Sequence, residues 1–220
     1  MKKLLTLFFS LCFCFSLQAQ DSETGNWLIY IGSKKINDKW NWHHEVQYRN
    51  YNFIGDLEQL LLRTGFGVNL TPGNNNLLLG YGYILSENYI PGTDDKLSIG
   101  EHRIFQQFVT KQKFGRVAIQ HRYRVEERWV ENSDFKWRFR YFLSLNIALS
   151  NKEIVADTWY LSLYNEIFLN GQNAVFDRNR MYAALGYRVS PQLKLELGYM
   201  SQVFEKRSRG QFQIASFANF

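Results

Sequence analysis

Apolar and polar side chains alternate with a period of two along most of the chain, which is the pattern of β-strands with two different faces. In one stretch, for example, Ile119 and Tyr123 alternate with Arg122 and Arg124. Helical periodicity is poor, and residues 20–220 contain no run of 18 apolar residues, so the sequence predicts no membrane-spanning helix. The alternation therefore predicts an all-β fold.

Eleven segments of the chain carry this alternation. Most are long for strands of a soluble domain, which average about 5–6 residues, and they suit tilted strands that cross a bilayer. The segments are residues 27–35, 39–50, 58–70, 76–87, 97–110, 115–129, 136–149, 157–169, 177–189, 192–204 and 210–220.

The predicted fold is a transmembrane, antiparallel, up-and-down β-barrel of about 10 to 12 strands, with a polar lumen and an apolar lipid face. Residues 20–220 are expected to form it as a single domain, because no linker or shift in composition divides them. Bacterial single-chain barrels have an even number of strands. We therefore expect either ten strands, with 27–35 at an edge or inside the lumen, or twelve, and we favour ten.

The apolar row is predicted to face lipid. Between residues 137 and 149 alone it contains seven large side chains, and a small lumen could not hold such a row from every strand. Tryptophans also lie near strand ends, as in the aromatic girdles of membrane barrels: Trp40, Trp42, Trp129, Trp137 and Trp159. A soluble, lipocalin-like binding protein of the periplasm, with the apolar row inside, is one alternative.

The N-terminus has the layout of a secretory signal peptide. Lys2 and Lys3 precede an apolar stretch over 4–17, and Ala19 offers a small residue for cleavage, so residues 1–19 are predicted to be removed. Both cysteines lie in this segment, which leaves no disulfide or thiolate metal site beyond it. The remaining 24 basic and 20 acidic side chains form no basic run, so nucleic acid is not an expected partner.

The last alternating segment ends at Phe220. A terminal aromatic residue after an amphipathic strand resembles the signal that the outer-membrane barrel assembly machinery reads. Together with the signal peptide, it predicts a protein of the cell outer membrane, with outer-membrane lipid and the barrel assembly machinery as partners.

Several short strings in the chain resemble one protein family. They are Glu101-His102-Arg103, the stretch 121–128, Arg138-Phe139-Arg140, Tyr164-Asn165-Glu166-Ile167-Phe168, Asp177-Arg178-Asn179-Arg180 and Gly198-Tyr199-Met200. The chain resembles domain-of-unknown-function family 2490 over about residues 27–220. The resemblance implies an outer-membrane barrel of Bacteroidota-type bacteria, and it implies no reaction.

The charged row is the candidate site. If the apolar row faces lipid, the lumen receives eleven arginines and one lysine against five glutamates. These residues are Glu45, Arg49, Arg63, Glu101, Arg103, Arg122, Arg124, Glu126, Arg128, Arg138, Arg140, Glu166, Arg178, Arg180, Arg188, Lys194 and Glu196.

Two interpretations of this row remain open. The side chains either pair across strands and fill a narrow lumen, or they form a lumen that selects small anions. We expect a network across the lumen in which Glu101, Glu126 and Glu166 accept hydrogen bonds from a set of arginines, namely Arg122, Arg124, Arg128, Arg138 and Arg140. The protein would then be a structural or small channel-like barrel.

Catalysis is not predicted. The chain has neither a G-x-S-x-G elbow nor a His-x-Ser spacing, so no catalytic residue is assigned. His43 and His44 point to opposite faces of one strand, and the sequence predicts neither a metal site nor a cofactor. An outer-membrane lipid-modifying enzyme, with a Ser–His pair formed between strands, is the second alternative.

Overall fold

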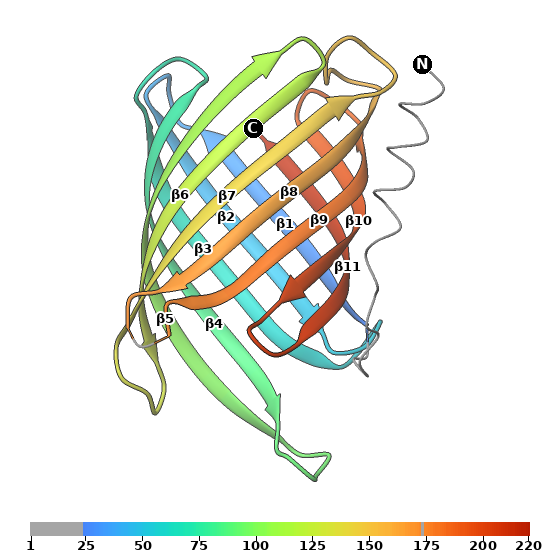
Figure 1. Cartoon of the computed structure of the whole chain (residues 1–220). Coiled ribbons are helices and arrows are strands. Elements are labelled where there is room, and N and C mark those ends of the chain that lie inside the picture. Colours follow the sequence, from blue (N-terminus) through green and yellow to red (C-terminus); the bar gives the residue numbers. More distant parts are fainter. Residues whose placement is uncertain (1–23, 173) are drawn as a thin grey trace.

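The computed structural model describes residues 24–172 and 174–220, which form a closed β-barrel (Figure 1). The predicted signal peptide, residues 1–19, lies outside the described residues. Within the described part, no helix is long and apolar enough to cross a membrane. The strands are β1 (Gly25–Lys35), β2 (Trp40–Asn50), β3 (Leu57–Asn69), β4 (Asn75–Tyr89), β5 (Lys96–Phe114), β6 (Val117–Val130), β7 (Lys136–Ala148), β8 (Thr158–Asn170), β9 (Phe176–Arg188), β10 (Leu193–Val203) and β11 (Ser208–Asn219).

The all-β barrel of about 10 to 12 strands is confirmed, whereas the narrower choice between ten and twelve strands, all antiparallel, is wrong. The barrel has eleven strands, and β1 pairs with β11 in parallel while it pairs with β2 in antiparallel orientation. In an up-and-down barrel an odd count makes the first and last strands run in the same direction. The closing pair is therefore parallel, and β1 is a full strand of the wall.

The two ends of the barrel differ. The turn end carries the β1–β2, β3–β4, β5–β6, β7–β8 and β9–β10 connections and the end of β11, and the loop end carries the other connections. β4 and β5 are longer than predicted, and their hairpin projects beyond the other strands at the loop end (Figure 1).

The interior has an apolar side and a charged side. Trp27, Tyr182, Ala184 and Met200 form a buried cluster under β1, β9 and β10. The buried arginines and glutamates lie mainly on β5 to β9. Gly186 makes room for the buried ring of Tyr160 inside the barrel. A Cβ atom at position 186 would lie 2.3 Å from Cζ of this ring and would collide with it.

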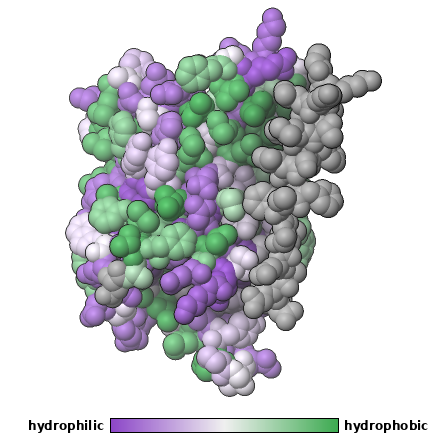
Figure 2. Space-filling view, in the orientation of Figure 1, coloured by the Kyte–Doolittle hydropathy of each residue, from purple (hydrophilic) through white to green (hydrophobic). Residues whose placement is uncertain are grey.

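The outward row is apolar around the barrel. Leu197 on β10 lies beside Leu185 on β9 and Ile214 on β11, and all three are exposed. Hydrophobic side chains cover much of the face seen in Figure 2, with hydrophilic ones between them. Five exposed tryptophans lie near the strand ends: Trp40, Trp42 and Trp159 towards the turn end, and Trp129 and Trp137 towards the loop end.

Many of the outward polar side chains are hydrogen-bonded to one another. The distances between the bonded atoms run from 2.6 to 3.1 Å. The pairs are Tyr30 with His44, Tyr81 with His102, His121 with Tyr141, Gln106 with Glu127, and Asn165 with Asn179.

Candidate anion-binding site in the lumen

Glu126 connects the charged side chains inside the barrel. It is fully buried on β6 and lies opposite Arg138 of β7 in the strand register. Arg138 donates to Glu126 Oε2 from Nε at 2.8 Å and from Nη2 at 2.5 Å. Arg140 donates to Oε1 at 2.6 Å. Both carboxylate oxygens are therefore bound by guanidinium groups of the neighbouring strand.

Glu101 and Glu166, on strands to either side of Glu126, accept hydrogen bonds from further arginines. Arg103 and Arg128 each donate two hydrogen bonds to the carboxylate of Glu101, at 2.5 to 3.0 Å. Glu166 Oε1 accepts from Arg122 at 2.7 Å and from Arg140 at 2.6 and 3.0 Å. Such bidentate and charge-assisted bonds are the strong ones among protein hydrogen bonds. The arginine–glutamate network is the set of residues Glu101, Arg103, Arg122, Arg124, Glu126, Arg128, Arg138, Arg140, Glu166 and Arg180.

Arg178 belongs to a smaller pair that the sequence did not indicate. Its Nη2 lies 3.0 Å from Asp177 Oδ1, and Asp177 Oδ2 lies 3.4 Å from Arg138 Nη1. The strict alternation assigns Asp177 to the outward row, beside Arg178 of the inward row. A bulge between β8 and β9, however, leaves Asp177 out of the strand register, so both side chains reach the network.

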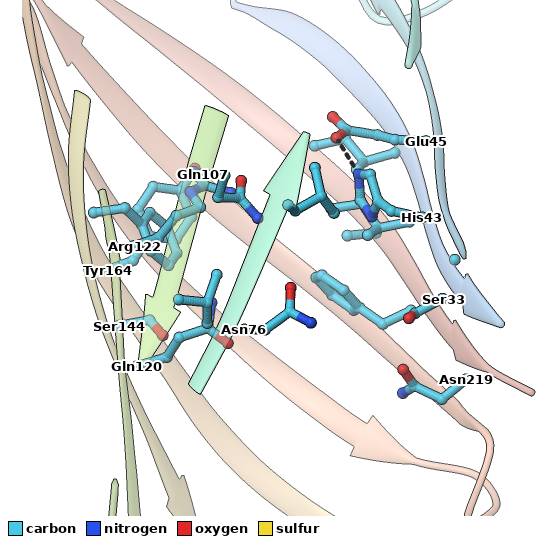
Figure 3. Close-up of a pocket in the computed structure, with 18 of the residues that line it drawn as sticks. Ser33, His43, Glu45, Asn76, Gln107, Gln120, Arg122, Ser144, Tyr164 and Asn219 are labelled. Atoms are coloured by element: carbon cyan, nitrogen blue, oxygen red, sulfur yellow. Dashed lines mark ion pairs between the residues drawn. The ribbon is translucent and has the colours of Figure 1, made fainter. Parts of the chain in front are cut away.

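A cavity of about 560 Å³ lies on the turn-end side of this network. Figure 3 shows polar side chains around it from many strands, among them Ser33, His43, Asn76 and Ser144. Its inner end is lined by Arg122, Arg124, Arg140, Glu166 and Arg180, and its lining extends to Asn74 and Phe220 at the turn end. Network residues nearer the loop end, such as Glu101 and Arg138, do not line it. The lumen is therefore partly filled rather than completely packed.

The cavity lining is strongly cationic. Three carboxylates line it, and each has polar partners: Glu45 pairs with Arg63, Glu166 with Arg122 and Arg140, and Glu196 with two tyrosines. Nine basic side chains line it: Lys35, Arg49, Arg63, Lys111, Arg122, Arg124, Arg140, Arg180 and Lys194.

Three of these cations have no carboxylate within 4.0 Å among the described residues, namely Arg49, Lys111 and Lys194. Arg49 instead donates to Gln47 and Gln59 and lies 3.6 Å from the centre of the Trp27 ring. The cavity thus carries a cationic excess that its own side chains do not neutralise.

Arg124 has a donor that its neighbours do not satisfy. Its side chain is 98% buried, and Nε and Nη2 donate to Gln107 Oε1 at 2.9 and 2.5 Å. Nη1 has no hydrogen-bond acceptor in the described part of the chain, and the nearest carboxylate oxygen, on Glu126, is 3.6 Å away. Arg122 Nε is unsatisfied in the same way. A buried donor without a partner costs about 1–3 kcal/mol, so each of these two arginines would gain from an acceptor that reaches it.

The histidines do not form a metal site. His43 points inward, with Nε2 at 3.4 Å from Glu45 Oε2, whereas His44, His102 and His121 form the outward pairs with tyrosines. Among residues 24–172 and 174–220, no group of three or more His, Cys, Asp or Glu side chains could hold a metal ion.

A family model of proteins of unknown function, DUF2490, matches residues 24–213. The chain belongs to this family. The match spans β1 to β10 and the first half of β11, and it includes every residue of the arginine–glutamate network. No curated protein and no solved structure matches this DUF2490 protein. Its function must therefore be argued from the geometry of the lumen.

Phe220 lies beyond the part of this DUF2490 protein that the family model matches. Its backbone N–H donates to the carbonyl of Ser33 at 3.0 Å, and its carbonyl accepts from the N–H of Lys35 at 2.7 Å. The side chain is exposed at the turn end and forms part of the cavity lining. Its role as an assembly signal stays a prediction.

Proposed function

We propose that the protein is a β-barrel of the bacterial outer membrane whose lumen binds a small anion. The membrane location is supported by the apolar outward row, by the tryptophans near both ends and by the signal peptide predicted for residues 1–19. The paired outward polar groups add to this support, because an unpaired polar group facing lipid would cost several kcal/mol.

We place the turn end of the barrel in the periplasm. Transmembrane barrels extend on their external side, and the longest hairpin here, β4–β5, projects at the loop end. This projection carries the orientation, because the connections have similar lengths at the two ends and the longest, residues 149–157, lies at the turn end. In this orientation the cavity opens towards the periplasm. The arginine–glutamate network then separates it from the cell exterior.

Anion binding rests above all on the cavity lining, which has nine basic and three acidic side chains and includes Arg124, whose buried Nη1 has no acceptor in the described part of the chain. Guanidinium groups bind carboxylates and phosphates through paired hydrogen bonds and keep their charge when buried. The cationic lining also attracts anions from solution, since a charged concave site with low-dielectric walls focuses its field.

Equilibrium dialysis with radiolabelled inorganic phosphate tests this binding. We expect one saturable site per barrel, and we expect Arg124→Gln to weaken it roughly tenfold, because a hydrogen bond to a charged group contributes about 1.5–3 kcal/mol. Arg207→Gln is the matched control, since Arg207 is exposed in the β10–β11 connection. Absence of saturable binding, or equal binding by the two variants, would refute the anion site.

Planar-bilayer recording tests whether the lumen conducts. We expect the purified barrel to insert and carry no steady current, because buried members of the network such as Glu126 and Arg138 lie between the cavity and the loop end. A steady, anion-selective current would contradict the closed lumen and favour a channel. Insertion is verified in the same preparation by protection of the strands from protease.

A further inference from the structure

The cavity has more room than an inorganic anion needs. Its volume of about 560 Å³ falls within the roughly 300–1,000 Å³ of pockets that bind organic molecules. A phosphate ion at Arg124 would fill a small part of it. The side chains around the remaining space indicate which chemical groups the rest of a ligand would carry.

Opposite the arginines, the cavity wall is apolar. The parallel pairing of β1 with β11 sets Ile29 beside Ala215 and Ile31 beside Phe217, and all four side chains line the cavity. Trp27 continues this strip to the point where the arginines begin, since Arg49 and Arg180 lie over its ring at 3.6 and 4.9 Å. In the closed strand order β6, which carries Arg122 and Arg124, lies across the barrel from β1. One wall therefore offers guanidinium groups, and the facing wall offers a strip of hydrocarbon with polar side chains such as Gln213 and Lys194 beside it.

We infer that the ligand is an amphiphilic organic acid, with its carboxylate or phosphate at Arg122 and Arg124 and its apolar body against the seam of β1 and β11. This inference rests on the proposed anion site and specifies its substrate class. Burial of the apolar body would add binding free energy in proportion to the area removed from water. The polar groups near the turn end, such as Asn41 and Asn76, would remain in contact with solvent.

Methyl NMR of the full barrel in detergent micelles, with the isoleucine methyl groups labelled, tests the inference with octanoate as the probe. We expect the Ile29 and Ile31 signals to shift saturably with one dissociation constant. Ile214, which faces outward, reports partitioning of octanoate into the micelle and should not saturate with that constant. Octanoate should bind roughly tenfold more tightly than inorganic phosphate.

Two variants separate the contribution of the acidic group to binding from that of the apolar body. Ile31→Asn should weaken octanoate binding roughly tenfold and leave phosphate binding within about twofold. Arg124→Gln should weaken both. Ile29→Asn repeats the first test at a second position, and heat-modifiable migration on gels verifies folding of each variant.

The outcomes distinguish the two proposals. If octanoate binds no more tightly than phosphate, or if neither isoleucine variant affects it selectively, the amphiphilic ligand is wrong and the anion site stands. If neither probe binds the folded barrel, the anion site itself is wrong.

Discussion

Glu126→Gln is expected to lower the free energy of unfolding of the barrel by about 3–5 kcal/mol, the usual cost of removing one partner from a buried ion pair. The carboxylate is fully buried and accepts from Arg138 and Arg140 through both oxygens. Its loss leaves guanidinium groups that are 94% buried without a counter-charge, apart from what Glu166 and Asp177 supply. Urea denaturation of the barrel reconstituted in vesicles measures the difference.

Glu127→Gln is the matched control for this change. Glu127 is the next residue of β6 and faces outward, where it accepts a single hydrogen bond from Gln106 at 3.1 Å. A glutamine can still accept that bond, so we expect a change below about 1 kcal/mol. Equal destabilisation by the two substitutions would show that the network does not stabilise the barrel.

The alternation of apolar and polar side chains predicted the strands well, because one face of most strands lines the polar lumen and the other lies on the apolar outside of the barrel. β7 is an example: it was expected over 136–149 and is formed by Lys136–Ala148, with Arg138 and Arg140 inward and Phe139 and Tyr141 outward. The same periodicity predicted that Glu101, Glu126 and Glu166 accept hydrogen bonds from arginines across the lumen. Such bonds are present, but they join strands that are adjacent or next but one in the barrel wall. An inward position on the strand and the pairing of the strands were enough to bring these three carboxylates into contact with arginines.

The closure of the barrel could not be predicted in the same way. The segment 27–35 was expected at an edge or inside the lumen because bacterial single-chain barrels have an even number of strands. In the structure β1 is a wall strand with apolar residues on both faces, Ile29 and Ile31 inward and Leu28 and Tyr30 outward. The physical reason is that its inward face lines the apolar side of the cavity. Pairing around a closed ring also depends on the partner strand, which the pattern of one strand does not specify.

The cavity and the contribution of Asp177 were also beyond the sequence. A period of two assigns each side chain to a face, but it does not give the distance that the side chain reaches across the lumen. The bulge opposite Phe168 and Leu169 inserts one extra residue into β9. Such a bulge changes which face of the strand the adjacent side chains occupy, and the alternation of apolar and polar residues does not reveal it.

Leu197→Arg tests the proposed location in the membrane. Leu197 lies near the middle of β10 and is 62% exposed on the outward row. If that row faces lipid, an arginine there costs about 2–4 kcal/mol of unfolding free energy near the bilayer midplane, because the guanidinium group loses its hydration. On a soluble barrel the same substitution would place a charge in water at nearly no cost. Urea denaturation in vesicles, compared with the wild-type barrel, measures the effect.

Ile54→Arg is the control that separates lipid contact from exposure alone. Ile54 is 79% exposed, more than Leu197, but it lies in the β2–β3 connection at the loop end, where the barrel is expected to meet water. We expect it to change the stability by less than about 0.5 kcal/mol. If Leu197→Arg were tolerated as well as Ile54→Arg, the outward row would face water. The aromatic residues near both ends would then need an explanation other than a girdle, and the cavity would belong to a soluble binding protein.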